Sequence, residues 1–394
     1  MDVQELVLVD GVRTPMTELN GSFADLSAIE LGARAAKALF ERTGIAPTDI
    51  DHSVVGNALQ TSADAIYGAR HVALRAGVPK EVPALTVNRL CGSGIQSIVS
   101  GGHLILAGEA TTCLVGGIEN MTQAPHVVRG ARKGFRLGHG QLEDSLLASL
   151  MDPYCGCYMA QTSNNLARDY GISREEQDAF ALESQRRAVA AWEAGRLAEE
   201  VVAVEVGSGK RAKLVERDEH PRPDTTMEGL AKLPPAFDEN GFVTAGNASG
   251  IVDGAAMMIL SSAEHARSRG WSTLGRILGW STVGVEPSRM GIGPAPAIRA
   301  VLAKRGMTLG DLDLLEINEA FAGQVLAVVR ELGLDTAKLN VNGGAIALGH
   351  PLGATGTRIT LTLLKELKRR GGGIGVASAC IGGGQGIAIL VESA

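Results

Sequence analysis

The sequence predicts an α/β protein in which one layered unit of strands and helices occurs twice. Buried-strand patterns alternate with helical patterns near both ends of the chain, which is typical of a sheet with helices against its faces. Two short segments recur in the same order farther along the chain. Of the 394 residues, 45% are hydrophobic but only 4% are aromatic, so we expect a core built from Ala, Val, Leu and Ile.

The first unit is predicted to occupy residues 1–121. Its helix carries Ile29 and Leu39 on one apolar face, and Gly44 follows as a stop signal. In chain order the predicted elements are a strand over 5–10, a helix over 27–42, strands over 51–57 and 84–87, a helix over 93–106 and a strand over 112–116.

The second unit is predicted over residues 252–394, with a helix over 297–304. Its strand 311–318 is similar in sequence to residues 49–57. Val341-Asn342 likewise matches Val87-Asn88, and a glycine-rich turn and a helix follow each pair. Because both matches keep the same order, we interpret them as an internal duplication.

The middle of the chain, residues 122–251, is more charged and less regular. It contains one strong helical pattern from Ser173 to about Leu197, and Ser173 with Glu176 forms a capping box at its start. We therefore predict an inserted loop domain that contributes to ligand binding.

Composition excludes several classes of protein. The 51 glycines show no Gly-X-Y period, which excludes collagen, and the net charge of -6 argues against a general nucleic-acid binder. The five cysteines are scattered without a CxxC pair, so we expect neither a metal site nor a disulfide framework. Since no signal peptide or run of about 18 apolar residues is visible, we expect a cytoplasmic protein without a membrane span.

Cys91 is the first candidate catalytic residue. It lies in Asn88-Arg-Leu-Cys-Gly-Ser-Gly94, between a predicted strand and a predicted helix. The positive end of the helix dipole lowers a thiol pKa, and glycines let a carbonyl approach the backbone. The segment therefore predicts a nucleophile, with a small buried cysteine in a tight turn as the alternative.

His350 and Cys380 occupy glycine-rich segments of the second unit. His350 precedes a helix at the position that corresponds to Cys91, where a neutral imidazole can take a thiol proton. Cys380 ends a strand and precedes three glycines, whose backbone N–H groups can face an oxyanion. Asn318 ends the repeated strand and is a weaker candidate. For His350 the alternative is a structural histidine, and for Cys380 it is a sharp turn after a core strand. The glycine-rich segments contain no nucleotide-binding fingerprint.

Together these segments resemble the thiolase family. The resemblance rests on residues 88–94, Gly246-Asn-Ala-Ser-Gly250, Asn318-Glu-Ala-Phe-Ala322, 343–351 and Cys380-Ile-Gly-Gly-Gly-Gln-Gly386, and it extends over nearly the whole chain. The 3-ketoacyl-CoA type is the most similar, judged from stretches such as 62–71 and 218–223. The resemblance implies a duplicated, layered α/β/α/β/α core with an inserted loop domain.

The resemblance also implies roles for individual residues. Cys91 corresponds to the acylated nucleophile, His350 to its activator and Cys380 to the acid/base cysteine. Asn318 corresponds to a residue that holds a water in one oxyanion hole, and the backbone N–H groups of Cys91 and Gly382 to the other. The residues that correspond to coenzyme A contacts are Ser249, Leu150, Met159, Ala245 and Phe321 along the pantetheine arm, and Arg222 near the adenine.

The implied activity is reversible, CoA-dependent cleavage of 3-ketoacyl-CoA, with acyl-CoA as substrate, no permanently bound cofactor, and a homotetramer or homodimer. Tyr158 stands where biosynthetic acetoacetyl-CoA thiolases commonly carry histidine, which puts a strict acetyl specificity in doubt. Basic residues around Lys210, Arg211, Lys213 and Arg222 either attract the CoA phosphates or form a solvated charged face.

Three other functions compete with a thiolase. A ketoacyl synthase pairs one cysteine with two activating polar residues, commonly two histidines, and a non-catalytic CoA- or lipid-binding protein is expected to lose Cys91, His350 or Cys380. A cysteine hydrolase would need a residue that activates water. The sequence favours a thiolase over all three, with an acetoacetyl-CoA thiolase as the nearest alternative.

Overall fold

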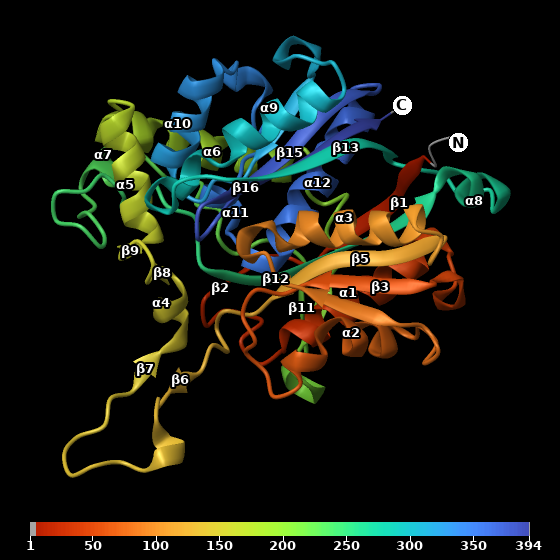
Figure 1. Cartoon of the computed structure of the whole chain (residues 1–394), viewed down its shortest axis with the longest axis horizontal. Helices are drawn as coiled ribbons and strands as arrows, with labels where there is room; N and C mark the ends of the chain where they lie inside the picture. Colours follow the sequence, from red (N-terminus) through yellow and green to blue (C-terminus); the bar gives the residue numbers. More distant parts are fainter. Residues whose placement is uncertain (1–4, 394) are drawn as a thin grey trace.

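The computed structural model describes residues 5–393 and contains one ten-stranded mixed sheet (Figure 1). A short strand, β2 (Thr17–Glu18), pairs with β12 beside the main path. Along that path the strands are β14 (Leu314–Ile317), β15 (Gly373–Ile381), β16 (Gln385–Ser393), β13 (Gly275–Gly284), β1 (Leu6–Arg13), β12 (Val252–Ser262), β5 (Thr112–Glu119), β3 (His52–Gly56) and β4 (Ala84–Val87).

The two halves of this sheet have the same strand pairing. In the first half β3 lies parallel to β4 and β5, and β12 is antiparallel to both β5 and β1. In the second half β14 lies parallel to β15, and β16 is antiparallel to both β15 and β13. A parallel bridge from Leu339 to Leu315 takes the place of β4. This matching pairing confirms the predicted duplication.

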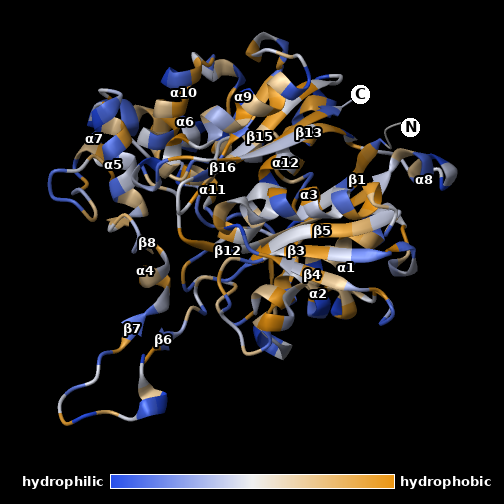
Figure 2. Cartoon of the chain, viewed as in Figure 1, coloured by the Kyte–Doolittle hydropathy of each residue, from blue (hydrophilic) through white to orange (hydrophobic). Residues whose placement is uncertain are grey.

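Helices and half-sheets alternate as α/β/α/β/α layers, as expected (Figure 1). Helices α3 (Ser93–Leu106) and α12 (Leu352–Arg369) share one apolar core with strands of both halves. On the outer faces, α1 (Ala28–Thr43) and α2 (Gly68–Ala76) cover the first half, and α9 (Pro294–Lys304) and α10 (Ala322–Leu332) cover the second. Figure 2 shows hydrophobic residues along central strands such as β1 and β12.

Glycines allow the two central helices to touch. A Cβ on Gly94 would lie 2.4 Å from the backbone nitrogen of Thr357, and one on Gly356 would lie 2.3 Å from that of Ile95. Since real Cβ contacts are never this short, no larger residue fits without a shift of backbone. Cys91 and His350 precede these two helices, so this contact brings their loops together.

The chain between β5 and β12 forms the irregular middle segment. The predicted capping box of Ser173 and Glu176 is confirmed at the start of its longest helix, α6. Between β6 and β7 the chain projects away from the core (Figure 1). Its elements are β6 (His126–Val127), β7 (Glu143–Asp144), α4 (Ser145–Ser149), β8 (Met151–Asp152), β9 (Cys157–Tyr158), α5 (Met159–Asp169), α6 (Arg174–Glu193), β10 (Val204–Val206), β11 (Lys213–Val215) and α7 (Met227–Ala231).

Strand β12 follows this segment and pairs with β5 and β1. The pairing groups residues 252–262 with the first half of the sheet, although the sequence analysis assigned them to the second unit. Helices α8 (Ala263–Ser268) and α11 (Ala345–Leu348) complete the fold. Within residues 5–393, no helix combines the length and apolar character that crossing a membrane requires.

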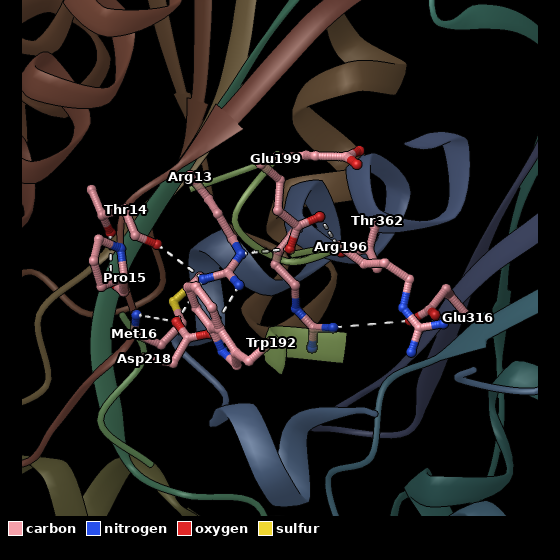
Figure 3. Close-up of polar contacts among 12 residues, drawn as sticks. Arg13, Thr14, Pro15, Met16, Trp192, Arg196, Glu199, Asp218, Glu316 and Thr362 are labelled. Carbon is pink, nitrogen blue, oxygen red and sulfur yellow. Dashed lines mark hydrogen bonds and ion pairs between the residues drawn. The ribbon is translucent and has the colours of Figure 1, made fainter. Parts of the chain in front are cut away.

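A buried arginine ties the inserted segment to both halves of the core (Figure 3). Arg13 ends β1, and its side chain lies 2.7 Å from the Glu200 carboxylate and 2.6 Å from that of Asp218. Glu200 also accepts a hydrogen bond from Thr362 of α12 at 2.9 Å, and Asp218 accepts one from the indole of Trp192 at 3.0 Å. One charged cluster therefore joins β1, the insertion and α12.

Candidate active site

Cys91 lies in a strained turn between β4 and α3. The residue before it, Leu90, has φ 46°, a left-handed conformation that bulky residues rarely adopt. Two side chains hold this turn: Asn88 Oδ1 accepts from the Leu90 N–H at 2.9 Å, and Ser93 Oγ accepts from the Arg89 N–H at 2.8 Å. Strain of this kind persists only where the surroundings enforce it, and it is common at functional sites.

Burial changes the expected acidity of Cys91. The helix dipole suggested a lowered pKa, but burial raises the pKa of this thiol to about 11, even though a backbone hydrogen bond from Gly382 favours the thiolate. The expectation from the helix dipole was therefore wrong for the resting protein, because desolvation outweighs the hydrogen bonds. The thiol needs a base before it can attack a carbonyl.

His350 has the properties of that base. Its Nδ1 lies 2.6 Å from the hydroxyl of Thr355, which in turn donates to the Pro351 carbonyl at 3.0 Å. Because that hydroxyl proton is already used, we assign a proton to Nδ1 and a lone pair to Nε2. Burial, together with the positive charge of Arg358, lowers the pKa of His350 to about 3, so the ring is neutral.

Asn318 and Cys380 lie next to this pair. Asn318 Nδ2 is 3.3 Å from His350 Nε2, and its Oδ1 has no hydrogen-bond partner within residues 5–393. Cys380 is fully buried near the end of β15, packed with Met159 and Phe321. Burial, together with the nearby Cys91, raises its pKa well above the ordinary thiol value.

Gly382 begins the turn after β15. Its backbone N–H hydrogen-bonds to the Cys91 sulfur, and a Cβ added to it would lie 3.1 Å from Leu90 Cδ1 and 3.4 Å from Met159 Sδ. A side chain here would meet the strained turn that carries Cys91. The glycine therefore keeps the approach to the sulfur open.

One cavity of about 380 Å³ connects Cys91 and His350 to the surface of the inserted segment. Its wall is largely apolar, which suits an alkyl or pantetheine chain better than a charged group. The residues singled out from the sequence that line it are Cys91, His350, Leu150, Tyr158, Met159, Ala245, Ser249 and Phe321.

Arg222 lies apart from that cavity. It lines an adjoining outer cavity of about 280 Å³, and Ala245 contributes to both. Lys210, Arg211 and Lys213 line neither cavity, and the Lys213 ammonium hydrogen-bonds to Ser22 at 2.9 Å. The structure brings Arg222 near the cavity that contains Cys91 but does not bring the other basic residues there.

Two residues of this region were not predicted from the sequence. Phe237 lines the cavity with φ 63°, and its ring lies 4.9 Å from that of Tyr158. No sequence pattern marks it. Glu119 is buried behind the Cys91 and His350 loops, and it reads in the sequence as an ordinary polar residue after a strand.

Comparisons with known proteins agree with this geometry. Residues 6–264 match the family model "Thiolase, N-terminal domain", and residues 271–393 match "Thiolase, C-terminal domain". The human "3-ketoacyl-CoA thiolase, mitochondrial" is 52% identical over 387 residues, covering 98% of each chain. The Pseudomonas aeruginosa "Acetyl-CoA acetyltransferase" is 48% identical over 391 residues, covering 99% of each chain.

A solved structure gives the same result. The human mitochondrial 3-ketoacyl-CoA thiolase in complex with CoA superposes with a TM-score of 0.97 at 51% identity, covering 100% of this chain and 98% of that one. The duplicated sheet, the paired glycine-rich loops and these matches over the whole length agree, and the chain belongs to the thiolase family.

Proposed function

We propose that this protein catalyses the reversible, CoA-dependent cleavage of 3-ketoacyl-CoA into acetyl-CoA and a shortened acyl-CoA. The observation that carries the proposal is that Cys91 and His350 line the same, largely apolar cavity. The name of the human relative and the presence of CoA in its solved complex support the same substrate class. CoA acts here as a substrate, and no permanently bound cofactor is required.

In the cleavage direction, the first half-reaction begins at the thiol. His350 Nε2 takes the Cys91 proton, and the sulfur attacks the C3 carbonyl of the substrate. The bond between C2 and C3 then breaks, which leaves the shortened acyl group on Cys91 as a thioester. The departing acetyl-CoA leaves as an enolate, and the Cys380 thiol protonates its carbon.

The second half-reaction regenerates the enzyme. The Cys380 thiolate takes the proton of an incoming CoA thiol, and that sulfur attacks the acyl group on Cys91. Acyl-CoA leaves, and the Cys91 thiolate recovers its proton from His350. We assign the enolate oxygen to a site formed by His350 and an Asn318-held water, and the acyl oxygen to the N–H groups of Cys91 and Gly382.

Binding of the CoA arm follows from the cavity wall. We assign the pantetheine to Ser249 and the apolar residues Leu150, Met159, Ala245 and Phe321, and the adenine end to Arg222. The adjoining cavities suit a ligand with a narrow chain and a polar head.

We favour a broad chain-length range over a strict preference for acetoacetyl-CoA. Tyr158 and Phe237 pack together in the cavity wall, so an aromatic pair stands where biosynthetic acetoacetyl-CoA thiolases commonly carry a histidine. This range fits fatty acid β-oxidation. An acetoacetyl-CoA thiolase remains the second candidate, because acetyl-CoA acetyltransferases are also similar over the whole length. We also propose that the protein forms a homotetramer or homodimer and that it is located in the cytoplasm.

Two measurements test this function. Acetyl-CoA should add one acetyl group to the peptide that contains Cys91, as seen by mass spectrometry, and a Cys91→Ala variant should remain unlabelled. A thiolysis series with 3-ketoacyl-CoA substrates of rising chain length then separates the two candidates. Absence of labelling, or labelling of another cysteine, would contradict the proposal.

A further inference from the structure

Glu119 is a buried carboxylate that the mechanism above does not use. It ends β5, and its side chain has no solvent exposure. Four N–H groups point at its two oxygens: the Asn57 side chain at 2.9 Å and the backbones of Ala58, Leu59 and Gly353 at 3.1, 3.0 and 2.8 Å. All of these partners donate, so the carboxylate form satisfies every one of them, while burial raises the pKa of Glu119 to about 7.

A continuous set of hydrogen bonds leads from Glu119 to the nucleophile. Glu119 fixes the backbone of Ala58, whose carbonyl accepts from the Asn88 side chain at 2.9 Å. The Oδ1 of Asn88 accepts from the backbone N–H of Leu90 at 2.9 Å. Leu90 is the strained residue directly before Cys91, so the carboxylate supports the turn that presents the sulfur.

Another contact of Glu119 leads to the loop that carries the base, His350. Gly353 is the second residue of α12, and its N–H is one that a helix leaves without an internal partner. Glu119 Oε2 caps this N–H three residues after His350. The approach is close: a Cβ on Gly117 would lie 1.9 Å from the Gly353 carbonyl oxygen.

We propose that Glu119 is a positioning residue that holds the Cys91 turn and the His350 loop at the spacing required for proton transfer. It touches neither substrate nor the reacting atoms and acts through backbone contacts on both loops. This inference rests on the proposed thiolase function, because it assumes that Cys91 and His350 react as a pair.

The chemistry of the four donors explains why glutamine cannot replace it. In Glu119→Gln one oxygen becomes an NH₂ group that faces N–H donors, so at least one buried donor loses its acceptor. Glu119→Asp keeps both carboxyl oxygens but is one methylene shorter, so it retains some of the contacts. A positioning role therefore predicts partial rescue by aspartate.

The test measures the reactivity of Cys91 in these variants. We expect Glu119→Gln to slow acetylation by acetyl-CoA, and alkylation by iodoacetamide, at least roughly 10-fold with KM for acetyl-CoA nearly unchanged. Glu119→Asp should lie between Gln and the wild type. The matched control is Asp51→Asn, because Asp51 accepts from the backbones of Thr111 and Thr112 at the opposite end of β5.

A double-mutant cycle keeps the proposal falsifiable if Glu119→Gln does not fold. Asn88→Ala breaks only the branch toward Cys91, so its effect on the alkylation rate should be less than additive with that of Glu119→Asp. Additive effects, or rates in a folded Glu119→Gln no lower than in Asp51→Asn, would overturn the positioning role. If the wild type is not acetylated at Cys91, the proposed function fails instead. The iodoacetamide rates of the Glu119 variants then still test whether Glu119 sets the spacing of the Cys91 and His350 loops.

Discussion

The His350 imidazole is oriented by Thr355, whose hydroxyl lies 2.6 Å from Nδ1. The histidine precedes α12 and the threonine lies in its first turn, so both belong to the same rigid helix start. The lone pair on Nε2 depends on this contact, because the hydrogen bond at one ring nitrogen sets the tautomer of the other.

Thr355→Val should therefore lower kcat for thiolysis about 10-fold, the cost of roughly one hydrogen bond. KM should change little, since Thr355 does not line the substrate cavity. Steady-state kinetics provide the measurement. Thr360→Val is the control, because among residues 5–393 the Thr360 hydroxyl bonds only to the Gly356 carbonyl of α12. Equal kcat values in the two variants would contradict the role of Thr355.

Cys380→Ala should separate the two half-reactions. Cys91 keeps its base in this variant, so mass spectrometry should still detect its acetylation. Condensation of acetyl-CoA should fall by at least about 100-fold, because the acid/base group for the enolate carbon is gone. Cys113→Ala is the matched control, since Cys113 is equally buried but belongs to β5 and the core around α3 and α12. Full condensation activity in Cys380→Ala would refute its assignment.

The neutral state of His350 predicts a loss of stability in acid. Its pKa is about 3 in the folded protein, below the ordinary value of 6.5. Below pH 6.5 only the unfolded chain binds this proton, so stability is lost as the pH falls from 6.5 toward 3. Between pH 7 and 5 the contribution is about 2 kcal/mol. Urea unfolding should show that His350→Gln loses less stability over this interval than the wild type; identical losses would contradict the depressed pKa.

The contact between α3 and α12 predicts a strong effect of one methyl group. Gly94→Ala should destabilise the fold by roughly 1–3 kcal/mol, because the new Cβ would lie 2.4 Å from the Thr357 backbone nitrogen. Gly140→Ala serves as the control, since the nearest atom to its Cβ is 3.9 Å away. The urea midpoints of the two variants provide the comparison, and similar midpoints would show that the helices adjust freely.

The charged cluster around Arg13 predicts a larger loss of stability than the Gly94→Ala substitution. Arg13→Met leaves the carboxylates of Glu200 and Asp218 without their shared cation and should cost about 3–5 kcal/mol of unfolding free energy. Arg129→Met removes the exposed pair with Glu143 and should cost little. Denaturant unfolding measures both, and a small effect of Arg13→Met would mean that the three segments hold together without the charge cluster.

Local signals made part of the fold predictable. The strand 84–87 and the helix 93–106 have the predicted bounds, since glycines and polar residues mark their ends. Helix α2 was not predicted, because no side chain caps its start at Tyr67. Strand β16 was missed as well, since a short apolar run after glycines fits a strand or a helix.

Long-range contacts explain why other features could not be predicted from the sequence. Arg13 and Glu200 are 187 positions apart, and nothing in either segment indicates the partner. Glu119 likewise depends on donors from two parts of the chain that lie far from it in sequence, residues 57–59 and Gly353. The acidity of Cys91 was misjudged for a related reason: the helix start is visible in the sequence, but the burial that raises the thiol pKa depends on the whole tertiary structure.

The repeated strand pairing has a consequence for the residues that each half can carry. In a symmetric dimer of identical half-length chains, equivalent positions must carry the same residue. Cys91 before α3 and His350 before α12 occupy equivalent positions, yet one is a thiol and the other an imidazole. Because both halves belong to one chain, each loop can carry its own residue, so one loop can specialise in attack and the other in proton transfer.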